Sequence, residues 1–218
     1  MQLRKGQSLL LLSHARNVAS ATETSWAAIV DRLLQSVYPD LNIRVDTLAH
    51  ATVAGGRAQP AWIDAVRQRK PDWLVLPPLT RADLSMLVPN GATMTPELLK
   101  ESLLPMLNEL RLYAKHIVLL SRFVLNESDG DEFAPYEEAV LEAAWEADSM
   151  VVSVKHAINE TKVKHACQPD QTNDETLRAD IELALANALL RSVGFQWVRR
   201  PSFFSLGDQL SHRMPHSS

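Results

Sequence analysis

The alternation of short apolar runs with longer amphipathic segments is the feature that most constrains the fold of this chain. The apolar runs, which we expect to form strands, cover residues 8–13, 42–45, 72–76, 116–121 and 150–154. The first run contains Leu9–Leu12 without a polar residue between them, as in a strand that helices cover on both faces. The pattern therefore predicts an α/β fold, a three-layer α/β/α sandwich around a five-stranded parallel sheet.

The segments between the runs contain typical helix start and stop signals. We expect helices at about 25–37, 60–70, 95–113, 135–147 and 174–193. Ser25 and Thr95 stand where a side-chain oxygen can accept a hydrogen bond from a free backbone N–H of the first turn. Gly194 follows the last helix, as a glycine often does. Four tryptophans fall on apolar stripes and are expected in the core: Trp26, Trp62, Trp73 and Trp145.

Length and composition indicate one domain in a reducing compartment. The 218 residues suit a single α/β domain, which we place at 1–197, with a polar C-terminal tail at 198–218. Cys167 is the only cysteine, so no intrachain disulfide can form. The apolar run after Arg4 and Lys5 is too short for a typical signal peptide. We therefore expect a cytoplasmic protein, whose oligomeric state the sequence leaves open.

Charge and motifs argue against several classes of partner. The formal net charge is -4, and Lys and Arg are scattered along the sequence, so we expect neither nucleic acid nor a membrane as partner. His165 and Cys167 lack a second pair of ligands at zinc spacing, so no metal is expected. The pair Gly55 and Gly56 lacks the rest of a phosphate-binding motif. No cofactor is predicted.

The candidate site lies on the loops that follow the strands. In open parallel sheets, ligands bind beyond the carboxyl ends of the strands, where the strand order reverses. The loops concerned begin near Ser13, Asp46, Pro77, Arg122 and Lys155.

Four segments resemble the SGNH (GDSL-type) ester hydrolases in sequence as well as in order. They are residues 9–17 at the exit of the first strand, 38–45, 70–76 and the final helix at 181–195. The resemblance covers roughly residues 8–195 and implies a flavodoxin-like topology with a Ser-His-Asp esterase site. It also implies an oxyanion hole formed by backbone amides and an asparagine side chain.

The residues that would carry this chemistry are replaced. The positions equivalent to the serine, glycine, asparagine, aspartate and histidine of the family hold Ala15, Ala49, Arg81, Asn173 and Thr176. An alignment to the family with a different gap places Gln168 and Gln171 at the aspartate and histidine positions, which again gives no histidine. Since Ala15 has no oxygen with which to attack an ester, the serine mechanism is expected to be lost.

Polar residues nevertheless gather around the predicted cleft. They are Ser13, His14, Arg16, Asn17, Asp46, Thr47, His50, Thr52, Arg81 and Asp83. One interpretation is an abandoned active site; the other is a relocated one, built from Ser13, His14, His50 and Arg81. Ser13 and His14 are adjacent in a strand and face opposite sides of it, so within this set His50 is the more suitable base for Ser13.

The sequence therefore leaves hypotheses from different classes. The first is a non-catalytic protein that binds a partner or a small acyl, acetyl-sugar or anionic ligand through Arg16, Asn17 and Arg81. The alternative is an esterase or acyl-transfer enzyme with a relocated centre at the same cleft. A third class is a structural subunit whose tail mediates assembly.

Overall fold

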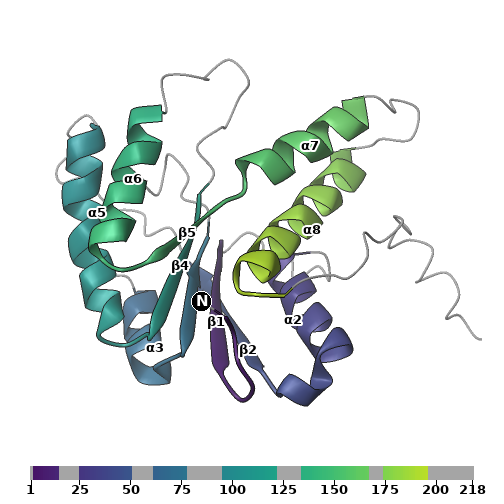
Figure 1. Ribbon diagram of the computed structural model, residues 1–218, viewed down its shortest axis with the longest axis horizontal. Coiled ribbons are helices and arrows are strands. Elements are labelled where there is room, and N and C mark those ends of the chain that lie inside the picture. Colours follow the sequence, from purple (N-terminus) through teal and green to yellow (C-terminus); the bar gives the residue numbers. More distant parts are fainter. Residues whose placement is uncertain are drawn as a thin grey trace, which may run out of the picture.

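A parallel sheet between two layers of helices forms the molecule (Figure 1). The computed structural model describes residues 2–14, 25–50, 61–77, 95–121, 134–166 and 174–195. The strands are β1 (Ser8–His14), β2 (Arg44–His50), β3 (Trp73–Leu76), β4 (His116–Ser121) and β5 (Met150–Ser153). They pair in parallel in the order β2-β1-β3-β4-β5, which is the flavodoxin-like order. The predicted fold class is confirmed.

Each face of the sheet is covered by its own helices. One layer contains α3 (Ala61–Arg69), α5 (Pro96–Arg111) and α6 (Ala134–Glu146). The other contains α2 (Trp26–Val37), α7 (Lys155–Ala166) and α8 (Asp174–Ser192). A short 3-10 helix, η1 (Pro39–Leu41), leads from α2 towards β2.

Helix α7 was not among the five helices that the sequence predicted. Ile158 is its one buried residue, so the segment shows no apolar stripe with helical spacing. The strand prediction at 42–45 also needs correction, because β2 covers Arg44–His50. Asp46 and Thr47 therefore lie within the strand and not in a cleft loop.

The core consists of two halves that β1 separates. Leu9 and Leu11 pack towards α2 and α8, whereas Leu10 and Leu12 pack towards α3 and α5, since successive side chains of a strand alternate. All four leucines are at most 2% exposed. Each one that is fully buried contributes about 2 kcal/mol through removal of apolar surface from water.

The tryptophan prediction holds for three of the four residues. Trp26, Trp62 and Trp73 are buried, but Trp145 is 86% exposed. The buried side of α6 contains Ala139, Val140, Ala143 and Ala144. These four small residues fill the space against the sheet, and Trp145 lies just outside their stripe.

The N-terminal segment is held against the end of α8. Leu3 N–H donates to Val193 O at 3.0 Å. Gly194, the predicted glycine after α8, has φ +98°, and a Cβ there would lie 2.6 Å from the Gln2 side chain. Glycine is therefore required both by the backbone conformation and by the close approach of the N-terminus.

Asp72 connects the amino ends of three neighbouring strands. Its Oδ2 accepts hydrogen bonds from Ser8 N–H at 2.8 Å and from Ser8 Oγ at 3.0 Å. Its Oδ1 accepts one from Lys115 Nζ. The Lys115 contact and the Ser8 hydrogen bonds lower the pKa of Asp72 to about 2. The carboxylate thus links β1, β3 and the residue that precedes β4.

No helix in the ranges given above is long and apolar enough to cross a membrane. The predicted domain boundary at 197 and Cys167 both lie outside the described residues.

The lowered pKa of Asp72 predicts a specific loss of stability in acid. A depressed carboxyl pKa stabilises the folded state above the unfolded-state pKa, and this contribution disappears as the pH falls towards 2. We expect the wild-type free energy of unfolding to lose roughly 1–2 kcal/mol from this group between about pH 5 and pH 2. Asp72→Asn should be less stable by about the same amount at neutral pH and should lack this part of the acid dependence. Urea unfolding across the pH range measures both, and identical pH profiles for the two proteins would contradict the assignment.

Candidate functional site

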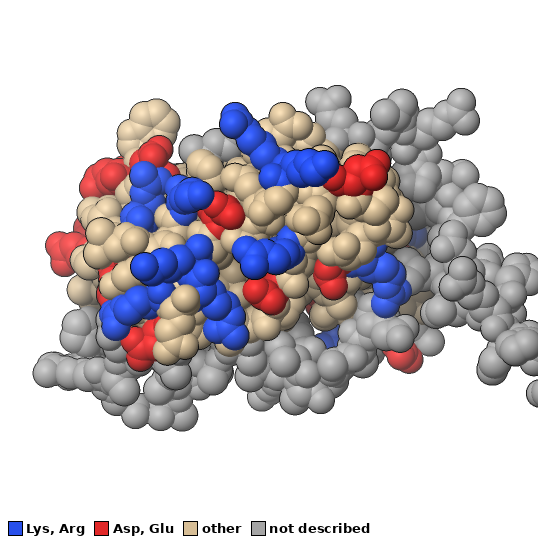
Figure 2. Space-filling model, turned by 90° about the horizontal axis from the view of Figure 1, so that it is seen from below, with Lys and Arg blue, Asp and Glu red and all other residues tan. Residues whose placement is uncertain are grey.

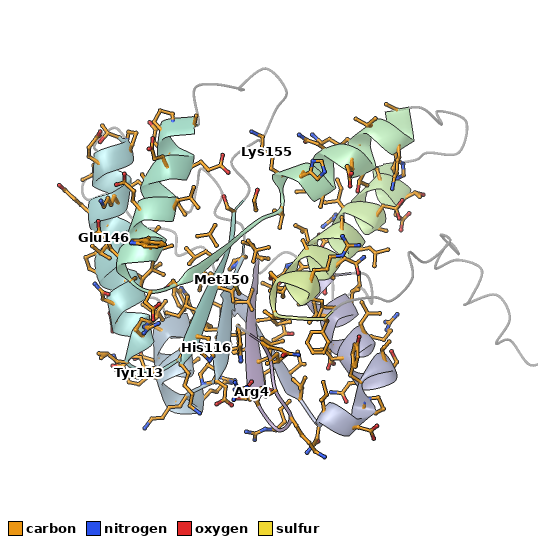
Figure 3. The ribbon with its side chains drawn as sticks, viewed as in Figure 1. Arg4, Tyr113, His116, Glu146, Met150 and Lys155 are labelled. Carbon is orange, nitrogen blue, oxygen red and sulfur yellow. The ribbon has the colours of Figure 1, made fainter. Side chains whose placement is uncertain are left out.

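The carboxyl ends of β1 and β2 lie side by side at one end of the sheet. The register pairs Ser13 with Ala49 and His14 with His50. Figure 3 shows Lys155, the first residue of α7, towards this end, and Arg4, Tyr113 and His116 towards the opposite end. The structure therefore brings the strand-end residues of the predicted site to one edge.

The Ser13 side chain is buried. It is 1% exposed, and its Oγ has no hydrogen-bond partner among the residues that the structure describes. It lies on the same face of β1 as Leu9 and Leu11, towards α2 and α8. The residue level with it on β2 is Ala49, which has no acid, base or hydroxyl group.

Ser121, the last residue of β4, is in a similar state. It is 3% exposed, and its Oγ is also without a hydrogen-bond partner. It shares a face of β4 with Ile117 and Leu119, which pack towards α5 and α6. The two unpaired hydroxyl groups therefore lie on opposite faces of the sheet and cannot act together.

Several residues of the predicted site cannot be placed. Ala15, Arg16, Asn17, Thr52, Arg81, Asp83 and Asn173 lie outside the described residues, as do Gln168 and Gln171. Thr176 is the third residue of α8 and is exposed. For His14, Ala49 and His50, the structure describes the backbone positions within the strands.

The N-terminus of α2 is satisfied by groups of the chain itself. Ser25, the predicted N-cap, accepts a hydrogen bond from Ala28 N–H at 3.3 Å. Glu182 of α8 accepts one from Trp26 N–H through Oε2 at 2.7 Å. A helix N-terminus favours an anion, and here the anion is the Glu182 carboxylate. The sequence did not predict this role of Glu182, because Glu182 and Trp26 are 156 residues apart in the chain and no local pattern links them.

The histidines with described side chains lie in structural contacts. His116, at the opposite end of the sheet, packs against Trp73 with ring centroids 4.4 Å apart, and burial lowers its pKa. His156 is exposed and lies 3.3 Å from Glu160. His165 Nε2 lies 2.8 Å from Asp180 Oδ2 and joins α7 to α8. Within the described ranges, no three His, Cys, Asp or Glu side chains form a group that could hold a metal ion.

A hollow of about 180 Å³ lies between the first turns of α5 and α6. It is lined by Pro96, Glu97, Lys100, Pro135, Glu138, Ala139 and Glu142. Lys100 Nζ lies 2.7 Å from both Glu142 and Glu146, and these two carboxylates raise its pKa. The hollow is smaller than a usual ligand pocket and contains a closed ion-pair network, so it is a gap between two helices.

Comparisons with known proteins agree with the fold. No family model matches the chain. It is 28% identical over 192 residues to an acetylxylan esterase from Geobacillus stearothermophilus, which covers 82% of this chain and 85% of the esterase. A crystal structure of that organism's acetylxylan esterase superposes with a TM-score of 0.65, at 24% identity, over 91% of this chain and 99% of the other.

Other solved structures extend the similarity. An α/β hydrolase from the metagenome of Lake Arreo superposes with a TM-score of 0.63 at 15% identity, over 88% of this chain and 97% of the other. Three matched structures are catalytic mutants of the Geobacillus esterase, in which a serine, an aspartate or a histidine is changed to alanine. The chain thus has the fold of the SGNH esterases and is a distant sequence relative of one of them.

The state of Ser13 gives a stability prediction with a matched control. Removal of a buried hydroxyl group that has no partner should leave the free energy of unfolding unchanged or raise it by up to about 1 kcal/mol. We therefore expect Ser13→Ala to be as stable as the wild type or more stable. Ser8→Ala removes a hydroxyl group that is hydrogen-bonded to Asp72 and should cost about 1–2 kcal/mol. Urea unfolding measures both; a clear loss in Ser13→Ala would mean that its hydroxyl group has a partner.

Proposed function

We propose that this protein is a non-catalytic relative of the acetylxylan esterases, and that it binds a small acetylated-sugar ligand beyond the carboxyl ends of β1 and β2. One observation carries the proposal. Ala15 follows β1 at the position that we align with the family serine, and the nearest preceding hydroxyl group, on Ser13, is 1% exposed and has no hydrogen-bond partner among the described residues.

The state of Ser13 counts against its use as a substitute nucleophile. A serine attacks an ester only if its oxygen reaches the carbonyl carbon and a neighbouring base accepts its proton. Ser13 Oγ meets neither condition in the described part of the chain, because it is buried and no described base lies within hydrogen-bonding distance. Loss of the nucleophile or the base of such a triad lowers kcat by about six orders of magnitude.

The ligand class is inferred from the relatives. The matched Geobacillus enzyme is described as an acetyl-xylooligosaccharide esterase, and this chain spans nearly all of its length. Ala49 retains the backbone N–H of the family glycine, since only a side chain differs, and it lies within β2, level with Ser13. We assign the remaining ligand contacts to Arg16, Asn17 and Arg81, whose donors suit sugar hydroxyl groups and carbonyl oxygens. A cytoplasmic location is part of the same proposal.

The second candidate is an esterase with a relocated centre. The register of His14 with His50 favours it, because it places two histidines at neighbouring backbone positions. Its weakness is the nucleophile. Ser13 is buried, and the residue level with it on β2 is Ala49, which cannot accept its proton. This candidate therefore needs a hydroxyl group from outside the described residues.

Activity and labelling assays separate the two candidates. We expect the purified full chain to show no turnover of p-nitrophenyl acetate above buffer and no covalent labelling by a fluorophosphonate. Acetylated xylo-oligosaccharides should raise the melting temperature, since a ligand at about 100 times its Kd adds about 2.7 kcal/mol to stability. The deacetylated oligosaccharides are the matched control. Turnover that disappears in His50→Ala would establish the second candidate and overturn the first.

Restoration of the triad tests the residue assignment itself. Ala15→Ser alone should remain unlabelled by a fluorophosphonate, because no base would activate the new hydroxyl group. The triple variant Ala15→Ser, Asn173→Asp, Thr176→His should become labelled, although more slowly than a complete site, since Arg81 replaces the oxyanion-hole asparagine. The control triple variant places Asp and His at Gln168 and Gln171 instead. Labelling of the control triple variant alone would show that Gln168 and Gln171 occupy the aspartate and histidine positions of the family.

A further inference from the structure

The amino ends of the strands form a basic face, which we call the amino-edge face. We define it as the charged side chains near the starts of β1–β4 and in the last turns of α3 and α5, with their ion-pair partners. Its basic residues are Arg4, Lys5, Arg44, Arg67, Arg69, Lys70, Arg111 and Lys115. Its acidic residues are Asp40, Asp64, Asp72, Glu109 and Asp148. Figure 2 shows this end of the molecule, with Lys and Arg spread across it.

Ion pairs account for only three of these cations. Arg67 pairs with Asp64 and Glu109, Arg111 with Asp148, and Lys115 with Asp72. The other five have no ion pair in the described part of the chain and are all exposed: Arg4, Lys5, Arg44, Arg69 and Lys70. The face therefore has free positive charge available for a ligand.

The five free cations belong to three adjacent strands. Arg44 begins β2, Arg4 and Lys5 precede β1, and Arg69 and Lys70 precede β3. Neighbouring strands lie about 4.8 Å apart, so these groups form a row across the sheet. Arg69 also belongs to the layer of α3, which widens the row into a two-dimensional array. Such an array matches a charged surface better than a single linear polymer.

The charge balance favours the amino-edge face over the rest of the molecule as the side that meets an anionic surface. Eight basic and five acidic residues leave the face with a surplus of three positive charges. Because the whole chain carries -4, the remainder carries a formal charge of -7. At physiological ionic strength the Debye length is about 8 Å, so this surplus is screened from charges at the opposite end of the sheet.

Exposed apolar side chains lie at the same end of the molecule. Leu112, directly after α5, is 76% exposed, and Val37, the last residue of α2, is 45% exposed. Leu112 lies in the chain between the cations Arg111 and Lys115. The neighbouring Tyr113 ring lies 5.2 Å from the Arg67 guanidinium carbon. Apolar side chains among cations suit the headgroup region of a bilayer, whereas phosphates of nucleic acid offer them no partner.

We propose that the amino-edge face attaches the protein peripherally to an anionic membrane surface, whose lipid phosphates and carboxylates bind the five free cations. Leu112 then lies against the acyl boundary. The candidate ligand site, at the opposite end of the sheet, faces the solvent. This proposal is independent of the function proposed for that site.

Vesicle co-sedimentation tests the proposal. We expect the full chain to bind phosphatidylcholine vesicles that contain about 30% phosphatidylserine, and not vesicles of phosphatidylcholine alone. Binding should weaken strongly between about 0.1 M and about 0.5 M salt. Each Lys or Arg near such a surface contributes about fivefold in affinity, so Arg69→Gln with Lys70→Gln should bind about 25-fold more weakly.

A second double variant makes the same change of charge elsewhere. Lys155→Gln with Lys162→Gln lies on α7 and should bind the anionic vesicles within about twofold of the wild type, allowing for weak long-range charge effects. Equal losses in both double variants, no binding by the wild type, or salt-independent binding would each overturn the proposal. So would tighter binding to heparin or duplex DNA than to the vesicles, because the face would then bind a polymer. Circular dichroism spectra should match for all variants.

Discussion

Burial of β1 on both faces is the constraint on which the rest of the structure depends. β1 hydrogen-bonds to β2 on one side and to β3 on the other, while helices cover both faces of Leu9–Leu12. A strand held in this way cannot shift without the loss of about 2 kcal/mol for each buried leucine. The same packing continues to Ser13, which explains why its hydroxyl group is enclosed. Burial of this strand thus holds the sheet together and also leaves the Ser13 hydroxyl group with little access to solvent.

The parallel arrangement gives the two ends of the sheet separate roles. All five carboxyl ends lie at one edge and all five amino ends at the other. Hydrogen bonds of Asp72 hold the amino ends of β1 and β3 together, while Glu182 closes the N-terminus of α2 on the other side. The two edges are therefore held by different side-chain contacts.

The fold was predictable because its signals are local. Each strand is marked by its own apolar run, and helix ends are marked by residues next to them, such as the caps Ser25 and Thr95 and the glycine Gly194. The sheet and most helices could therefore be predicted from the sequence. The errors have physical causes: α7 buries only Ile158 and has no stripe, and small residues of α6 leave Trp145 exposed. Glu182 and the amino-edge face were missed because only the folded chain brings their partners together. The strand-end residues of the predicted site lie together at the carboxyl edge of the sheet, but most of the site's side chains lie outside the described residues.

The two edges also explain how a hydrolase fold could persist after the loss of hydrolysis that we propose. The apolar runs that stabilise the sheet contain none of the residues that we align with the triad, which are Ala15, Asn173 and Thr176. Thr176 is exposed, so a substitution there costs the core nothing, whereas a polar residue in place of Leu11, which is 0% exposed, would disrupt the core. Selection on stability alone retains the framework and ignores the catalytic residues. The binding function that we propose needs donors on the loops after the strands, and it does not need the triad.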